Sequence, residues 1–269
     1  MKKKIIAHAH IFKNAGSTID WILRRNFSER FYDNREDFKM RTDPSYLLEF
    51  LLSKPDLEAF SSHSLPLPIR EHSKFDFYTV AMLRHPLLRV KSVYDFERKQ
   101  PGDTPGAINA KKLTFAEYVK WRMRDDVAPT IRNMHVRYLT ANSHQRIENL
   151  TESHYDGALQ FVLENRLVGV VEDFDKSMVI FSDYLSENDI NVDFAYRKQN
   201  ESRNKEDSVS VQSLCESLGD ELYQILVQKN EMDIRLYDSV SEVVNKRFNS
   251  IHEREVKLNK LQNSSIALA

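Results

Sequence analysis

The chain has 269 residues, and its 39 Lys and Arg nearly balance its 40 Asp and Glu, for a formal net charge of −1. This balance argues against a dedicated nucleic-acid or polyanion binder, which normally has a large basic excess. Cys215 is the only cysteine, so an internal disulfide is excluded and a reducing compartment is expected. No run reaches the ~18–20 apolar residues of a membrane helix. The lysine-rich start is interrupted by His8, His10 and Lys13, which favours a strand over a signal peptide.

The hydrophobic pattern predicts strands that alternate with helices. Apolar runs predict strands at residues 5–11, 57–61, 75–83 and 167–171. Helices are expected from Thr18 and from Pro86, then over 114–124, 130–141, 151–165, 174–185 and most of 209–261. Residues 100–106, rich in Pro and Gly, predict a loop. Such alternation implies an α/β fold with a central, mostly parallel sheet flanked by helices.

The domain organisation follows from the same pattern. We expect a single domain over residues 1–240, with a helical cap of about residues 100–165 beside the sheet. Residues 241–269 are expected to form a helical tail. The apolar residues Val240, Val244 and Phe248 are expected to pack on their own domain, and a homodimer through the C-terminal helices is the alternative.

The first candidate site joins a predicted strand to a predicted helix. Its residues are Lys13, Asn14, Ala15, Gly16, Ser17 and Thr18. Such a loop presents backbone N–H groups and the positive end of the helix dipole to an anion. Gly16 allows close approach, Ser17 and Thr18 add hydroxyls, and Lys13 adds a positive charge. The lysine precedes the glycine, whereas it follows the last glycine in a Walker A loop. An ordinary strand–turn–helix is the alternative.

The second candidate site follows the predicted strand of residues 75–83. Arg84 lies at the carboxyl end of this strand, where ligands bind in open α/β sheets. Ser92 is eight residues further on, about two helical turns, so both can face one ligand. An arginine and a hydroxyl in this arrangement suit a second phosphate. A structural ion pair for Arg84 and a solvent-facing Ser92 form the alternative.

These motifs resemble those of the membrane-type carbohydrate sulfotransferases. Residues 10–19, HIFKNAGSTI, resemble their 5′-phosphosulfate-binding loop, usually HIPKTAGTSL, and residues 83–94, LRHPLLRVKSVY, resemble their 3′-phosphate motif, usually LRDPVERVLSHY. Further segments match in the same order along the chain. They are residues 133–139, 168–174, 200–202 and 233–237. The resemblance spans residues 6 to about 240.

The resemblance implies a P-loop-NTPase-like sulfotransferase fold that binds 3′-phosphoadenosine-5′-phosphosulfate (PAPS) and releases 3′-phosphoadenosine-5′-phosphate (PAP). It implies transfer of the sulfuryl group to a hydroxyl of a carbohydrate or glycoconjugate without a metal. Lys13 is expected to stabilise the leaving phosphate. His63 resembles the base of the uronyl 2-O-sulfotransferases, with Glu71 and His72 as the nearest competitors. His8 or His10 could face the same crevice. Arg203 and Lys205 are expected, by resemblance, to cover the nucleotide, and a solvated charge run is the alternative.

Three residues depart from the family pattern. Phe12 replaces the usual Pro, Asn14 the usual Thr, and His85 the usual Asp. The first two replacements still allow the backbone N–H groups of the loop to bind an anion, but they are expected to alter the geometry of the loop. The third is expected to remove a supporting carboxylate from the start of the helix.

Two other functions compete with the sulfotransferase interpretation. The first is an ATP- and magnesium-dependent phosphotransferase, for which Glu172 and Asp173 are the candidate metal ligands. The second is a non-catalytic nucleotide-binding scaffold that associates through its C-terminal helix. Because the first predicted strand begins within five residues of Met1, we expect a soluble, bacterial-type cytoplasmic enzyme. Acceptor selectivity is expected to depend on residues 28–56, 64–74 and 98–165.

Overall fold

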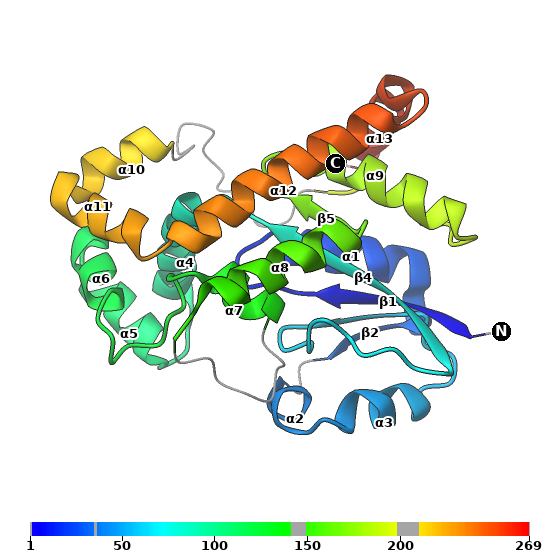
Figure 1. Cartoon of the computed structure of the whole chain (residues 1–269), viewed down its shortest axis with the longest axis horizontal. Coiled ribbons are helices and arrows are strands. Elements are labelled where there is room, and N and C mark those ends of the chain that lie inside the picture. Colours follow the sequence, from blue (N-terminus) through cyan, green and yellow to red (C-terminus); the bar gives the residue numbers. More distant parts are fainter. Residues whose placement is uncertain (1, 35–36, 141–148, 198–209, 269) are drawn as a thin grey trace.

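The computed structural model describes residues 2–34, 37–140, 149–197 and 210–268. Within these ranges, five strands form one fully parallel sheet with the order β2-β3-β1-β4-β5 (Figure 1). The strands are β1 (Lys3–Ala9), β2 (Phe31–Asn34), β3 (Ala59–Ser62), β4 (Phe75–Leu83) and β5 (Val168–Val170). The predicted α/β class with a central parallel sheet is therefore confirmed.

The strand boundaries agree with the prediction where the apolar run is longest. β4 begins and ends at the predicted residues. β1 ends at Ala9, two residues earlier than predicted, because the backbone N–H of Ile11 turns back to the carbonyl oxygen of Ala9 at 2.8 Å. His10 and Ile11 therefore belong to the loop. β2 was not predicted, since a four-residue edge strand is too short for a periodic pattern.

Helices connect the strands and extend the chain beyond the sheet. They are α1 (Gly16–Phe27), α2 (Asp37–Thr42), α3 (Tyr46–Leu52), α4 (Pro86–Lys99), α5 (Pro105–Lys112), α6 (Phe115–Arg122), α7 (Met134–Thr140), α8 (Glu152–Glu164), α9 (Phe174–Glu187), α10 (Val211–Leu218), α11 (Asp220–Gln228), α12 (Glu231–Ser250) and α13 (Arg254–Leu268), with a short 3-10 turn at Ser28–Arg30. The predicted loop at 100–106 ends early, because Thr104 caps α5 by accepting a hydrogen bond from the backbone N–H of Ala107.

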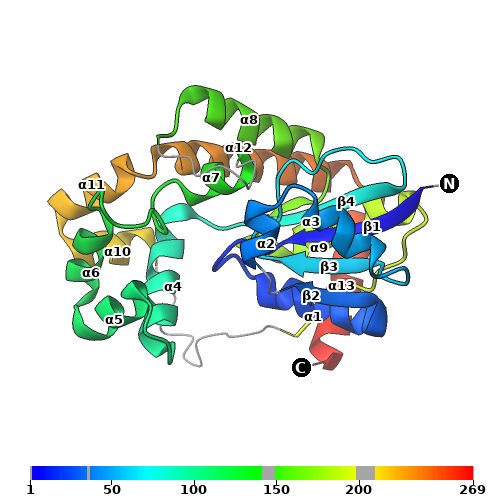
Figure 2. The ribbon, with the colours of Figure 1, turned by 90° about the horizontal axis from the view of Figure 1, so that it is seen from below.

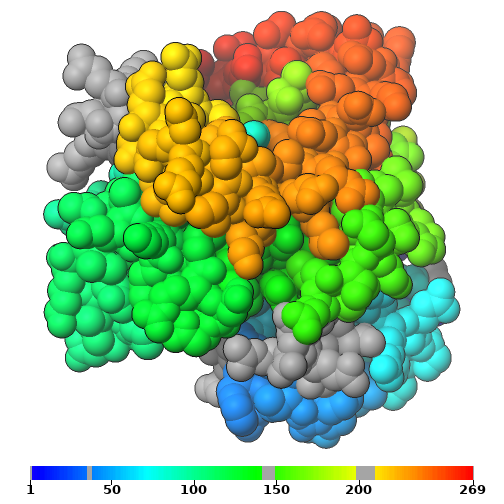
Figure 3. Space-filling view, turned by 60° about the vertical axis from the view of Figure 1, so that its left-hand side comes forward, coloured from blue at the N-terminus to red at the C-terminus, as the bar shows by residue number. Residues whose placement is uncertain are grey.

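The helices form two layers and a separate lobe. α1 lies on one side of the sheet, and α7 and α8 lie on the other (Figure 2). Beyond the carboxyl ends of the strands, α4, α5, α6, α10 and α11 pack together around a second hydrophobic cluster. We call these five helices the helical lobe. Its α5 and α6 (teal) and α10 and α11 (yellow) form one block of surface beside α12 (Figure 3).

The C-terminal helices pack on the same domain. α12 contacts β5, α8 and α9, and α13 contacts α9. Val240, Val244 and Phe248 are buried in the main core, which confirms the expectation that they pack within the chain. In the part of the chain that the structure describes, none of the helices combines the length and the apolar character needed to cross a membrane.

Two of the matched segments, around residues 133 and 233, cap each other's helices. The side-chain oxygen of Asn133 accepts a hydrogen bond from the backbone N–H of Asp233 at 3.0 Å, at the start of α12. In return, the carboxylate of Asp233 accepts hydrogen bonds from the backbone N–H groups of His135 and Val136, each at 2.9 Å, at the start of α7. Burial raises the pKa of Asp233 to about 6, although these backbone bonds oppose the shift. This pair of segments joins α7 to α12.

Candidate active site

The sheet order brings the main candidate residues to one edge. β3, β1 and β4 are neighbours, with Ala9 of β1 opposite Ser62 of β3 and Ala81 of β4. Because parallel strands end at the same edge, the residues that follow them lie side by side. His63 follows β3, the β1–α1 loop (residues 10–15) follows β1, and Arg84 follows β4. Three segments separated by up to about 70 residues thus meet at one edge.

The β1–α1 loop has an unusual backbone. Lys13 and Ala15 have φ angles of 65° and 59°, in the left-handed region, whereas Asn14 between them does not. Alternation of this kind is typical of anion-binding nests, and here the N–H of Asn14 donates to the carbonyl oxygen of Ile11 at 3.2 Å. Ala15 is also the N-cap of α1 and has no side-chain oxygen with which to cap it. The first N–H groups of the helix have no partner within the helix, so the loop and helix together suit an anion.

Two side chains hold this strained loop in place. The Asn14 side-chain amide donates to the carbonyl oxygen of Met82 at 2.8 Å and lies 2.9 Å from Nε2 of His135. Arg89 of α4 is buried and donates through Nε to the carbonyl oxygen of Phe12 at 2.9 Å. Left-handed residues other than glycine persist only where their surroundings fix them. Asn14 and Arg89 supply that support, and the sequence analysis gave Arg89 no role.

Gly16 is required by a neighbouring ring. A Cβ atom at this position would lie 2.0 Å from Cδ2 and 2.2 Å from Nε2 of His10, distances that real Cβ atoms do not adopt. The imidazole edge of His10 therefore rests against the first residue of α1. Sequence reasoning assigned the glycine to close approach by an anion, whereas here the group that approaches closely is a side chain of the protein itself.

Positive charges gather around the loop. The Lys13 ammonium lies 4.8 Å from the centre of the Phe96 ring on α4. Burial, followed by the positive charge of Arg84, lowers the pKa of Lys13. Burial also lowers the pKa of Arg84, and the carboxylate of Glu172 opposes that shift. Ser92 lies one turn before Phe96, on the same face of α4. A bound anion would relieve the mutual repulsion of Lys13 and Arg84.

A carboxylate does support the start of α4, contrary to expectation. Glu172, which follows β5, accepts hydrogen bonds from the backbone N–H of His85 at 3.1 and 3.3 Å. The hydroxyl of Tyr237 donates to the same carboxylate at 2.9 Å. The expectation that the start of α4 lacks a supporting carboxylate is therefore wrong. Position 85 lacks the usual Asp, but Glu172, which follows β5, supplies the carboxylate.

His63 is oriented by the backbone of the neighbouring loop. Its Nδ1 donates to the carbonyl oxygen of His10 at 2.8 Å. A carbonyl oxygen can only accept, so Nδ1 carries the proton and Nε2 carries the lone pair in the neutral ring. The His63 and His10 rings lie 4.1 Å apart between centres. A histidine held in this tautomer can act as a general base through Nε2.

The competing candidates for the base lie at the other end of the sheet. His72 accepts a hydrogen bond from the backbone N–H of Lys74 at 3.1 Å, immediately before β4 begins. At about 3.3 Å per residue, the length of β4 separates His72 from Arg84 by roughly 25–30 Å. Glu71 is next to His72 in the chain. The structure therefore brings His63, but neither Glu71 nor His72, to the edge that carries Lys13 and Arg84.

Comparison with known proteins agrees with this geometry. The model of the sulfotransferase family matches residues 1–238. The chain belongs to the sulfotransferase family. An uncharacterised protein of Archaeoglobus fulgidus is 29% identical over an alignment of 269 positions, which covers 92% of this chain and all of that relative. Sulfuryl transfer is thus the general activity of this chain, and sulfotransferases of this family generally use PAPS as donor.

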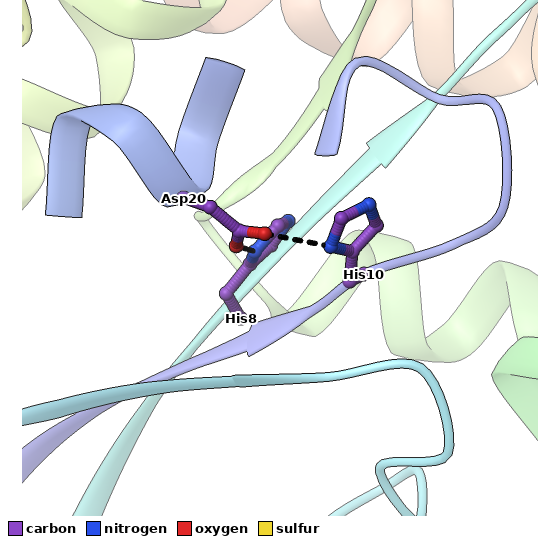
Figure 4. Close-up of side chains that lie close together, drawn as sticks. All are labelled: His8, His10 and Asp20. Atoms are coloured by element: carbon purple, nitrogen blue, oxygen red, sulfur yellow. Dashed lines mark hydrogen bonds and ion pairs between the residues drawn. The ribbon is translucent and has the colours of Figure 1, made fainter. Parts of the chain in front are cut away.

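This sulfotransferase also contains a buried cluster that sequence reasoning missed. Asp20 of α1 lies between two histidines of the β1 segment (Figure 4). One carboxylate oxygen is 2.8 Å from Nδ1 of His8 and the other is 2.9 Å from Nδ1 of His10. Each residue offers one possible ligand atom, and these three atoms lie within 4.8 Å of one another, close enough to be considered for a metal ion. Nδ1 of His8 is hydrogen-bonded to one carboxylate oxygen and Nδ1 of His10 makes an ion-pair contact with the other, so these contacts account for the cluster.

Arg203 and Lys205 lie outside the described residues, so their expected position over the nucleotide stays a prediction. Ser17 is exposed and Thr18 is buried in the first turn of α1.

Proposed function

We propose that this sulfotransferase moves the sulfuryl group of PAPS to a hydroxyl of a carbohydrate or glycoconjugate. The observation that carries the proposal is the meeting of His63, Lys13 and Arg84 at the carboxyl ends of three neighbouring strands. This arrangement places a candidate base beside a loop suited to one anion and an arginine suited to another.

Two separate anion sites match the two anionic groups of PAPS. The β1–α1 loop and the start of α1 would hold the 5′-phosphosulfate through backbone N–H groups. Arg84 and Ser92 would hold the 3′-phosphate, since Arg84 lies two residues before α4 and Ser92 lies in its second turn. ATP has no 3′-phosphate, so an ATP-dependent enzyme would have no use for the second site.

The residues supply the two functions that sulfuryl transfer requires. When bound, PAPS supplies a sulfuryl group with PAP as its leaving group. Nε2 of His63 would accept the proton of the acceptor hydroxyl as its oxygen bonds to sulfur. Lys13 and the N–H groups of the loop would stabilise the negative charge on the phosphate oxygen as its bond to sulfur breaks. The products are a sulfate ester, PAP and a proton on His63.

The phosphotransferase alternative depends on a carboxylate for magnesium. Glu172 and Asp173 were its candidates, but the carboxylate of Glu172 accepts hydrogen bonds from the backbone of His85 and the hydroxyl of Tyr237. The carboxylate of Asp173 forms an ion pair with Lys176 at 2.8 Å. A carboxylate engaged at the start of α4 favours a supporting role over metal ligation.

Calorimetric titration with PAP, ADP and ATP plus magnesium tests the proposal. We expect PAP to bind much more tightly than ADP, because ADP lacks the 3′-phosphate. Preference for ATP with magnesium would contradict the proposal. Transfer from radiolabelled PAPS to a panel of polysaccharides, lipid-linked glycans and small alcohols would then identify the acceptor class. Label found only on the small alcohols would contradict the carbohydrate assignment.

A further inference from the structure

The buried Asp20 carboxylate makes two directed contacts. Asp20 lies in the second turn of α1, and only 6% of its surface is exposed. Each of its oxygens faces one imidazole nitrogen, Nδ1 of His8 or Nδ1 of His10 (Figure 4). An ionised carboxylate only accepts hydrogen bonds, so Nδ1 of His8, which is hydrogen-bonded to it, carries a proton. Nδ1 of His10 makes an ion-pair contact with the other oxygen at 2.9 Å. Burial acts to raise the pKa of Asp20, but the hydrogen bonds from His10 and His8 outweigh it and hold that pKa well below its usual value.

His10 connects this carboxylate to the candidate base in two ways. Its backbone carbonyl accepts the hydrogen bond from Nδ1 of His63 at 2.8 Å. Its ring packs against the His63 ring, with centres 4.1 Å apart. The other edge of the same ring rests on Gly16 at the start of α1. A rotation of the His10 ring would therefore disturb both the face that supports His63 and the first residue of the anion-binding helix.

We propose that Asp20 is a positioning residue for His63 and acts through His10. By fixing Nδ1 of His10, Asp20 sets the plane of the His10 ring, and that ring holds the imidazole of His63 with Nε2 available for the acceptor proton. The inference rests on the proposed role of His63 as general base.

The contact with His8 provides a matched control. Nδ1 of His8 also lies 2.9 Å from the hydroxyl of Ser61 on β3. Ser61 is fully buried, and it belongs to the His8 half of the cluster. Ser61→Ala removes a buried polar contact of this network, while the contacts from Asp20 to His10 and from His10 to His63 stay in place. A general loss of packing would affect both variants, whereas loss of positioning would affect only Asp20→Ala.

The experiment compares PAP release from PAPS, PAP affinity and imidazole NMR spectra in wild type, Asp20→Ala and Ser61→Ala. We expect Asp20→Ala to lower kcat by about 10²-fold, the scale of a misplaced catalytic group, and to weaken PAP binding by a much smaller factor, because the His10 ring also rests on Gly16. Long-range ¹H–¹⁵N spectra should show altered ring-nitrogen shifts for His10 and His63. Ser61→Ala should keep the wild-type kcat and the wild-type His63 signals.

A second variant covers the case in which Asp20→Ala fails to fold. His10→Asn keeps an N–H donor toward Asp20 but removes the ring that packs on His63, so it should also lower kcat and shift the His63 signals.

Three results would overturn the inference. They are a wild-type kcat in Asp20→Ala, an equal loss of kcat in Ser61→Ala, and a lowered kcat with unchanged His63 signals. The variant His63→Ala distinguishes an error in the role of Asp20 from an error in the proposed function. If His63→Ala abolishes PAP release while Asp20→Ala retains it, only the role of Asp20 is wrong. If His63→Ala itself retains the wild-type rate, the base assignment falls and the inference falls with it.

Discussion

The two candidate phosphate-binding segments follow neighbouring strands, yet they are held in different ways. The β1–α1 loop contains two left-handed residues and depends on two contacts: the Asn14 amide donates to the carbonyl oxygen of Met82 on β4, and Arg89 of α4 donates to the carbonyl oxygen of Phe12 in the loop. The segment after β4 instead begins a regular helix with Pro86 in the first turn, and a single carboxylate, Glu172, supports its start.

The two segments therefore differ in what determines their backbone conformation, which is the local sequence in one and contacts with other segments in the other. Proline presets the helical φ angle at the first position, so the start of α4 forms from its own sequence. The β1–α1 loop adopts a conformation that costs of order 1–3 kcal/mol per left-handed residue and that other segments must maintain. Disturbance of its supports should therefore affect the β1–α1 loop much more than equivalent changes affect the start of α4.

Lys13→Ala should have the largest effect on activity. Removal of a group that stabilises transition-state charge costs about 10²–10³-fold in kcat. PAP release from PAPS under saturating donor measures this loss. Lys99→Ala serves as the control, because Lys99 adds to the same positive region from the end of α4. Equal losses in the two variants would mean that general charge, and not the position of Lys13, determines the rate.

Gly16→Ala should destabilise the protein and weaken PAP binding. The new Cβ would overlap the His10 ring, and overpacking of this kind typically costs about 1–3 kcal/mol in the free energy of unfolding. Gly157→Ala, within α8, is the matched control, since its Cβ would lie 3.3 Å from a methyl carbon of Thr140 at the end of α7. Its stability should stay within ~1 kcal/mol of wild type. Urea denaturation compares the two, and an unperturbed Gly16→Ala would refute the close packing of His10.

Asn14→Ala should release the loop from β4. Loss of the side-chain amide leaves the carbonyl oxygen of Met82 and Nε2 of His135 without their donor, at a cost of about 1–3 kcal/mol. We expect both lower stability in urea and weaker PAP binding. Asn109→Ala removes an exposed hydrogen bond within α5 and should change stability by less than about 0.5 kcal/mol. Unchanged PAP affinity in a destabilised Asn14→Ala would show that the loop does not need this anchor.

Glu172→Gln should have the smallest effect. Glutamine keeps an oxygen that accepts the hydrogen bond from the backbone of His85, and the lost charge costs less than ~1 kcal/mol. PAP affinity should be unchanged or slightly higher, because a negative charge near Arg84 is removed. A large loss of PAP affinity would mean that the start of α4 depends on remote support as much as the β1–α1 loop does.

The sequence predicted the sheet best where hydrophobicity alone determines a strand. β4 is a nearly continuous apolar run, so its bounds were predicted correctly. β2 has four residues at the sheet edge, and nothing in their order separates them from a loop. The predicted strands favoured a common site for Lys13 and Arg84, because each follows a strand of one parallel sheet, whereas His63 was assigned to that site by resemblance.

The supports of the site could not be predicted because they come from distant parts of the chain. Glu172 is 87 residues from the backbone group of His85 that it binds. Asp20 is buried within α1 beside Ile19, and its local sequence gives no sign of its two histidine partners. The role of Arg89 depends on a carbonyl oxygen 77 residues earlier. Only the folded arrangement of the strands reveals such pairs.

The most direct test of the two-site account compares PAP with adenosine 5′-monophosphate, which differs from PAP only by the missing 3′-phosphate. Isothermal titration of wild type and Arg84→Ala with both nucleotides isolates the contribution of that phosphate. We expect wild type to prefer PAP strongly and Arg84→Ala to lose most of that preference while it binds the monophosphate as before. An equal preference for PAP in both proteins would contradict the assignment of Arg84 to the 3′-phosphate.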